Sequence, residues 1–109
     1  MTGEEGSLDK TELEEYQEFV ASCPQPPNDK FKAYWASTQM ICEAAEVLEI
    51  FEKSYRKGKE VDGGHLEDEL GDVIWGIAAI CNATGLKLDD VIMNNINKLS
   101  ERHDIDQKA

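Results

Sequence analysis

The sequence predicts an all-α protein. No segment of the 109 residues shows sustained alternation of apolar and polar side chains, and apolar side chains instead recur every three or four positions. The stretches with this helical spacing are bounded by residues that start and stop helices, such as Asn28 and Gly58. We therefore expect one all-α domain over residues 1–109, with flexible ends at 1–7 and 104–109.

The first helix is predicted to begin at residue 11 and to end at about residue 22. Thr11 and Glu14 have the spacing of a capping box, in which each side chain accepts a hydrogen bond from the backbone of the other, while Ser7 offers an earlier start. The segment CPQPPN that follows ends this helix, because proline lacks the N–H group that a helix needs.

The second helix is expected to be long. Asn28 or Asp29 can cap its first turn, and its helical pattern continues to about Lys57. Gly58 ends it, since glycine readily takes the left-handed conformation that closes a helix. A loop is expected over residues 58–64.

Two more helices complete the chain, at about residues 65–84 and 88–103, with Gly85 between them. All the later helices are long for so short a chain. A single copy would leave apolar stripes exposed to water. We therefore expect a helical bundle that is completed by homo-oligomerisation.

The acidic composition excludes one class of partner. The chain has 11 lysine and arginine residues against 23 aspartate and glutamate residues, so that its net charge is −12. Because nucleic-acid phosphates would be repelled, we expect no binding to nucleic acid. No apolar run reaches the roughly 20 residues of a membrane span, and no signal-peptide pattern opens the chain, so we expect no membrane association and a cytoplasmic location.

Two pairs of acidic residues repeat one pattern. The segments 43–48 (EAAEVL) and 69–74 (ELGDVI) both read E-x-x-[E/D]-V-[L/I]. Acids three positions apart share one face of a helix. The pattern therefore predicts one pair on the second helix, Glu43 and Glu46, and a matching pair on the third, Glu69 and Asp72.

Both acid pairs lie at the same angle from an apolar stripe when each residue turns the helix by about 100°. We expect the two stripes to pack against each other in an antiparallel hairpin, which would bring the four acids to one side. The expected stripes are Met40, Ala44, Leu48, Phe51 and Tyr55 on the second helix, and Leu66, Leu70, Val73, Ile74, Ile77 and Cys81 on the third.

Four converging carboxylates need a compensating cation, because unpaired charges beside a core are costly. Mg²⁺ suits carboxylates, water and substrate phosphate. Zinc is disfavoured by the lack of Cys and His at ligand spacing, and the glycines of Asp62-Gly63-Gly64-His65 argue against a helical face there. The alternative is that the four acids are surface charges of an acidic protein.

The order of these motifs resembles the MazG-like all-α nucleoside triphosphate pyrophosphohydrolases, a superfamily that includes dimeric dUTPases and phosphoribosyl-ATP pyrophosphohydrolases. The resemblance covers residues 35–103. It rests on the two acid pairs with 22 residues between them, on Asp72-Val73-Ile74-Trp75, and on the terminal motif Asn95-x-x-Lys98-Leu99-x-x-Arg102.

The resemblance implies Mg²⁺-dependent cleavage of a ribo- or deoxyribonucleoside triphosphate to the monophosphate and pyrophosphate. It also implies a homo-oligomer, a dimer or tetramer, with the site near the subunit interface. We choose Glu46 as the catalytic carboxylate that positions the attacking water or accepts its proton. Carried over residue by residue, the metal ligands are Glu43, Glu46, Glu69 and Asp72, and the substrate contacts are Asn95, Lys98 and Arg102.

Other interpretations stay open at this point. The chain could be a non-catalytic acidic helical module that binds a partner protein or a structural metal ion. Within the enzyme class it could be a phosphoribosyl-ATP pyrophosphohydrolase or a dUTPase. The basic run from Lys53 to Lys59 is expected to be solvated, or to contact phosphate from a neighbouring subunit, and His65 and His103 are expected at the surface.

Overall fold

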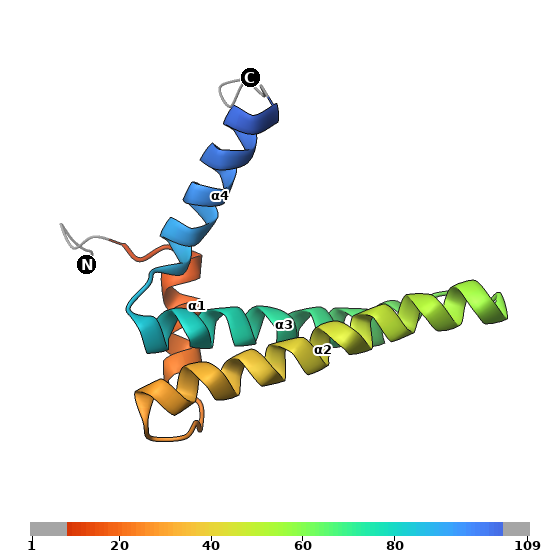
Figure 1. The fold of residues 1–109 in the computed structure, drawn as a ribbon, viewed down its shortest axis with the longest axis horizontal. Helices are drawn as coiled ribbons and strands as arrows, with labels where there is room; N and C mark the ends of the chain where they lie inside the picture. Colours follow the sequence, from red (N-terminus) through yellow and green to blue (C-terminus); the bar gives the residue numbers. More distant parts are fainter. Residues whose placement is uncertain (1–8, 104–109) are drawn as a thin grey trace.

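The computed structural model describes residues 9–103 and shows four α-helices and no strand in that part of the chain (Figure 1). The all-α prediction is confirmed, while the ends predicted to be flexible lie outside the described residues. No helix in the described range is long and apolar enough to cross a membrane. The helices are α1 (Glu12–Ala21), α2 (Asp29–Lys57), α3 (Gly63–Thr84) and α4 (Leu88–His103).

The predicted capping residues mark where the helices begin and end. The hydroxyl of Thr11 accepts from the N–H group of Glu14 at 3.0 Å, and the Thr11 N–H group donates to the Glu14 carboxylate at 2.8 Å. Asn28 caps α2 with its side-chain oxygen. Gly58 and Gly85 end α2 and α3 at φ values of 65° and 79°, in the left-handed region that glycine adopts without strain.

The third helix begins two residues earlier than predicted. The Asp62 side chain accepts from the N–H group of His65 at 3.2 Å and caps a helix whose first residues are Gly63 and Gly64. The expectation that the two glycines keep this segment out of a helix is therefore wrong. A capping carboxylate supplies the acceptor that a helix start needs, and this outweighs the low helix propensity of glycine.

The longest contact joins α2 and α3, which lie side by side and antiparallel (Figure 1). Gly76 is buried at this contact, and a Cβ atom built on it would lie only 2.9 Å from the Cβ atom of Met40. We call the shielded positions along this contact the α2–α3 seam. They are Ala36, Met40, Glu43, Val47 and Ile50 on α2, and Leu66, Glu69, Val73, Gly76 and Ile80 on α3.

The apolar stripes predicted from the sequence form only part of the contact surface. Met40, Leu66 and Val73 lie in the seam, whereas the other side of each stripe does not. Leu48 and Tyr55 are 68% and 90% exposed, and Leu70 and Ile74 are 45% and 49% exposed. The seam is turned from each stripe toward the acidic residues by less than the rotation of one residue. Because the two helices are antiparallel and turned in the same sense, the exposed parts of both stripes face water on one common side of the pair.

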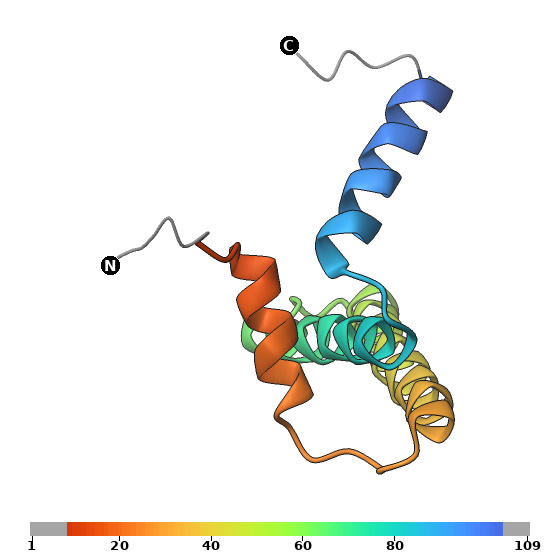
Figure 2. The ribbon, with the colours of Figure 1, turned by 90° about the vertical axis from the view of Figure 1, so that its left-hand side faces the viewer.

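The first helix, α1, packs against both α3 and α4. Its Val20 is fully buried in a cluster with Ala78, Ala79 and Cys81 of α3. The helix α1 crosses α3 (Figure 2). The Gln17 side chain donates to the Asn82 side chain at 2.9 Å and to the Leu86 carbonyl at 3.0 Å, and accepts from the Leu88 N–H group at 2.8 Å. One side chain thereby fixes the end of α3 and the start of α4, and α4 extends away from the α2–α3 pair in both views.

We expect Gly76→Ala to lower the free energy of unfolding by about 1–3 kcal/mol, because the new methyl group overpacks the seam against Met40. Gly71→Ala on the same helix is the matched control, since nothing lies within 4 Å of the Cβ atom built there. That change should raise the free energy of unfolding by about 0.5–1 kcal/mol through helix propensity. Urea unfolding followed by circular dichroism measures both, and equal effects of the two variants would contradict the seam described above.

Candidate functional site

Three of the four predicted acids meet at the α2–α3 seam. Glu43 comes from α2 and Glu69 and Asp72 come from α3, and one carboxylate oxygen of each lies within 4.8 Å of those of the other two. The three-residue spacing of Glu69 and Asp72 puts both on the side of α3 that faces α2. The structure thus brings acids from two helices to one point, as the repeated motif predicted.

Glu69 is a carboxylate that is buried between two helices. It is 7% exposed, and the carboxyl group of the neighbouring Glu43 shares a hydrogen bond with it. The nearest basic atom is Nε2 of His65, at 3.8 Å from the carboxylate oxygen. A buried charge that lacks partners is costly to the fold. A cation bound at the seam would offset the negative charge of Glu69 and its acidic neighbours.

The neighbouring acids compete for ionisation. Burial raises the pKa of Glu43 above its usual value, and the carboxylates of Glu69 and Asp72 raise it further through hydrogen bonding and negative charge. The negative charges of the two neighbours therefore oppose the ionisation of Glu43. These groups present only oxygen ligands, the kind that Mg²⁺ prefers, and a divalent ion would relieve the repulsion. The donor set therefore fits the metal predicted from the sequence.

Glu46 belongs to a second group of ligand atoms, which includes His65, a residue that the sequence did not indicate. One ligand atom each of Glu46, His65 and Glu69 lie within 4.8 Å of one another. His65 was expected only as a surface residue, and it does remain more than half exposed. The signal that could have found it is its four-residue spacing to Glu69, but that spacing matters only if the segment is helical, and the two glycines hid this.

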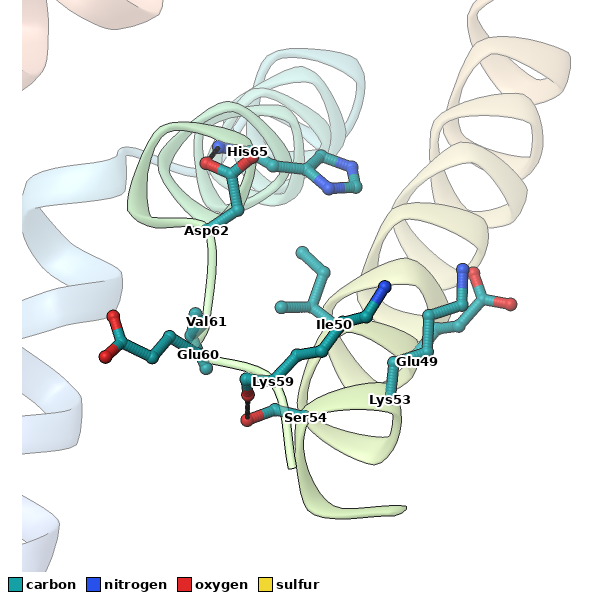
Figure 3. A pocket seen from close by; sticks show the side chains of 9 residues that line it. All are labelled: Glu49, Ile50, Lys53, Ser54, Lys59, Glu60, Val61, Asp62 and His65. Carbon is teal, nitrogen blue, oxygen red and sulfur yellow. Dashed lines mark hydrogen bonds between the residues drawn. The ribbon is translucent and has the colours of Figure 1, made fainter. Parts of the chain in front are cut away.

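A cavity of about 170 Å³ lies beside His65, between the last turns of α2 and the loop that leads to α3 (Figure 3). Lys53 and Lys59 line it together with His65, so two members of the basic run face the same space. The cavity is smaller than the roughly 300 Å³ at which pockets for small organic ligands begin. One chain therefore does not enclose a ligand of nucleotide size at this point.

The predicted substrate contacts lie on a different element. Asn95, Lys98 and Arg102 are exposed on α4, which extends away from the α2–α3 pair (Figure 1). Lys98 and Arg102 are four residues apart and share one face of that helix. Within a single chain, the structure does not bring these three residues to the acidic cluster.

Comparison with known families gives one match. Residues 36–105 match the family model described as the MazG nucleotide pyrophosphohydrolase domain, which covers well over half of the chain. No curated protein and no solved structure matches the chain. The matched range contains both acid pairs and the terminal Asn-x-x-Lys-Leu-x-x-Arg motif, and the resemblance found in the sequence is confirmed.

In metal-free protein, we expect the free energy of unfolding to fall as the pH rises above about 4.5, the usual pKa of glutamate, and through the raised pKa of Glu43. The fold favours protonated Glu43, so this contribution is complete below the usual pKa and is lost as the folded protein ionises. Glu43→Gln stays neutral and should remove that loss. Thermal melts in EDTA across the acid to neutral range measure this.

The matched control for this experiment is Glu101→Gln, a change at an exposed position of α4. It should melt like the wild type at every pH. If Glu43→Gln showed the same pH dependence of its melting temperature as the wild type, then repulsion at the seam would not be the cause.

Proposed function

Because this chain belongs to the MazG nucleotide pyrophosphohydrolase family, we propose that it is a Mg²⁺-dependent nucleoside triphosphate pyrophosphohydrolase. Its substrate is a ribo- or deoxyribonucleoside triphosphate, and its products are the monophosphate and pyrophosphate. The observation that carries this proposal is the meeting of Glu43, Glu69 and Asp72 at the seam of a chain of this family. No other cluster of three acids is present in the described part of the chain.

The carboxylates have separate tasks in this proposal. Glu43, Glu69 and Asp72 hold Mg²⁺ at the seam, and Glu46 extends the ligand set. When bound, Mg²⁺ neutralises the triphosphate and makes a bound water more acidic. Glu69 is fixed by burial between two helices, and a ligand that cannot move keeps its geometry through the reaction.

Glu46 is the residue proposed to handle the proton. It is exposed beside the buried Glu69, so its carboxylate can face both the cluster and incoming water. The attacking water passes a proton to Glu46 as its oxygen bonds to phosphorus. The anhydride bond between the α- and β-phosphates breaks, and its electron pair leaves with pyrophosphate.

A second copy of the chain is proposed to complete the site. The exposed stripes of α2 and α3 form an apolar face that includes Leu48, Phe51, Leu70 and Ile74, and faces of this kind mark interaction surfaces. The α4 residues that would contact phosphate lie away from the acids of their own chain. A homo-oligomer, a dimer or tetramer, would cover the apolar face. It could also bring the α4 residues of one chain to the acid cluster of a neighbouring chain.

We expect pyrophosphate release from at least one nucleoside triphosphate in a panel of ribo- and deoxyribonucleotides, and no release in EDTA. Glu46→Gln should lower kcat by about 10²–10⁴-fold, the usual contribution of a general base, while metal binding by the seam acids persists. A coupled pyrophosphate assay measures both. Glu101→Gln serves as the control and should keep full activity.

Two results would sink the enzymatic proposal. One is the absence of pyrophosphate release from every nucleotide. The other is activity unchanged in Glu43→Gln, Glu46→Gln and Glu69→Gln alike. Metal-dependent stabilisation without any nucleotide response would then favour the non-catalytic metal-binding module.

The shared site makes a separate prediction, which uses two inactive variants. Glu69→Gln disables the acid cluster and Lys98→Met disables the α4 contact. If the acids of one chain work with α4 of another, mixed dimers contain one intact site of two, and random mixing should restore about a quarter of wild-type activity. Mixing after partial unfolding and refolding, followed by the pyrophosphate assay, measures this. Mixtures that stay as inactive as the separate variants would place the whole site within one chain.

A further inference from the structure

We propose that α1 determines the direction of α4, and that Gln17 is the positioning residue through which it does so. Lys98 and Arg102, two of the proposed substrate contacts, lie on α4. The inference rests on the proposed function for its catalytic meaning, whereas the direction of α4 can be measured without turnover. The helix α1 precedes residues 36–105, which match the family model, so its role is additional to what that match covers.

Within the described residues, α4 is anchored by its first turn. Leu88 is buried and Val91 packs against the same core cluster, whereas all residues from 92 to 99 are exposed. The helix packs more closely against α1 than against any other helix, and it then extends away from the rest of the chain (Figure 1). The contacts at the start of α4 therefore decide where its far end lies.

Gln17 supplies an acceptor that the start of α4 lacks. The first N–H groups of a helix have no partner within it, and a capping side chain ordinarily provides one. Lys87 occupies the capping position, since its carbonyl accepts from the Val91 N–H group at 3.0 Å, but a lysine side chain has no acceptor atom. The side-chain oxygen of Gln17 accepts from the Leu88 N–H group at 2.8 Å instead.

The same amide also holds the residues that precede α4. Its nitrogen donates to the Asn82 side-chain oxygen at 2.9 Å and to the Leu86 carbonyl at 3.0 Å. The Asn82 amide in turn donates to the backbone carbonyl of Gln17 at 3.0 Å. Gln17 thus binds the end of α3, the connecting loop and the first residue of α4 at once, which fixes their relative arrangement.

A second link joins the other end of α1 to α4. The hydroxyl of Thr11 donates to the Asp89 carboxylate at 2.9 Å. Thr11 and Gln17 are about 9 Å apart along the helix axis. Two links at this separation oppose a change in the angle between α1 and α4, because a tilt has to break one of them.

A small tilt at the start of α4 becomes a large displacement at its phosphate contacts. Leu88 and Arg102 are 14 positions apart in the sequence. That separation is about 21 Å along a helix, so a tilt of about 15° would move Arg102 by about 5 Å. A misplacement of about 1 Å can already cost 10²-fold in rate. Substrate contact by α4 therefore requires that its direction be fixed.

Spin labels measure this direction in the full chain. Cys42 on α2 is exposed and takes one label, and Glu101→Cys on the exposed part of α4 takes the other. Cys23→Ala removes a competing thiol, while Cys81 is buried. Refolding with excess unlabelled chain restricts each measured pair to one chain. By double electron–electron resonance, we expect Gln17→Met to shift the label distance by at least about 3 Å, given the length of α4.

Steady-state kinetics measures the effect on the substrate. Gln17→Met should raise KM for the nucleoside triphosphate by about tenfold or more, because its phosphate contacts are displaced. The Mg²⁺ affinity of the acid cluster, measured by calorimetry, should stay unchanged. A variant that only folds less well lowers the active fraction and therefore kcat, but it keeps the KM of the wild type. Glu15→Met, at an exposed position of α1, is the matched control and should change neither constant.

A third variant separates positioning from helix capping. Lys87→Asp gives α4 a capping side chain of its own. If Gln17 served only as a cap, combining this change with Gln17→Met would restore the KM of the wild type. Because the new side chain makes no link to α1, we expect the double variant to regain stability to urea while its KM and label distance stay shifted.

The results distinguish this inference from the proposed function. A wild-type label distance in Gln17→Met overturns the role of α1 even if the protein hydrolyses nucleotides. An unchanged KM in Gln17→Met, or its restoration by Lys87→Asp, overturns the role of Gln17 in placing the substrate contacts. A shifted distance in a protein that releases no pyrophosphate supports the control of α4 by α1 and overturns the proposed activity.

Discussion

The close approach of α2 to α3 is the constraint on which the rest of the molecule depends. Gly76 permits it, since any side chain there would strike Met40 on the facing helix. The two helices then touch along a narrow seam that passes through Glu43 and Glu69 as well as through apolar residues. A carboxylate is thereby buried at a place where a helical bundle would ordinarily hold a leucine.

This placement connects the folding of the chain to its chemistry. Buried acids that repel one another weaken the native state, and a bound cation reverses the effect, because it binds the folded chain and not the unfolded one. The geometry that is unfavourable for an empty helix pair is favourable for a metal centre. We infer that the seam is a compromise in which stability is given up for a preformed set of ligands.

Two other features have a common explanation. The α2–α3 pair turns apolar side chains such as Leu48 and Ile74 toward water, and α4 carries its cationic residues away from the acids of the same chain. Both features leave a single chain incomplete, the first in its packing and the second in its proposed site. The proposed second copy of the chain would cover the exposed apolar side chains and could bring cationic α4 residues to the acids of its neighbour.

Part of the candidate site could be predicted from the sequence, because residue spacing determines relative position on a helix. The acids Glu69 and Asp72 could be placed on one face because their spacing fixes their relative angle in any helix. Their meeting with Glu43 followed from the repeated motif. His65 could not be placed in the same way, because its position depends on the Asp62 cap overcoming two glycines, a balance between opposing local preferences.

The sequence by itself determined the helices, since caps and turns act over three or four neighbouring residues, as Thr11, Asn28, Gly58 and Gly85 show. Only the tertiary structure decided which faces of α2 and α3 meet. Apolar periodicity predicts which face of a helix is shielded from water, but it does not identify the surface that shields it. Here the small Gly76 lets the chain's own helices approach along the acidic side, and the outer parts of the apolar stripes, such as Leu48 and Ile74, stay exposed.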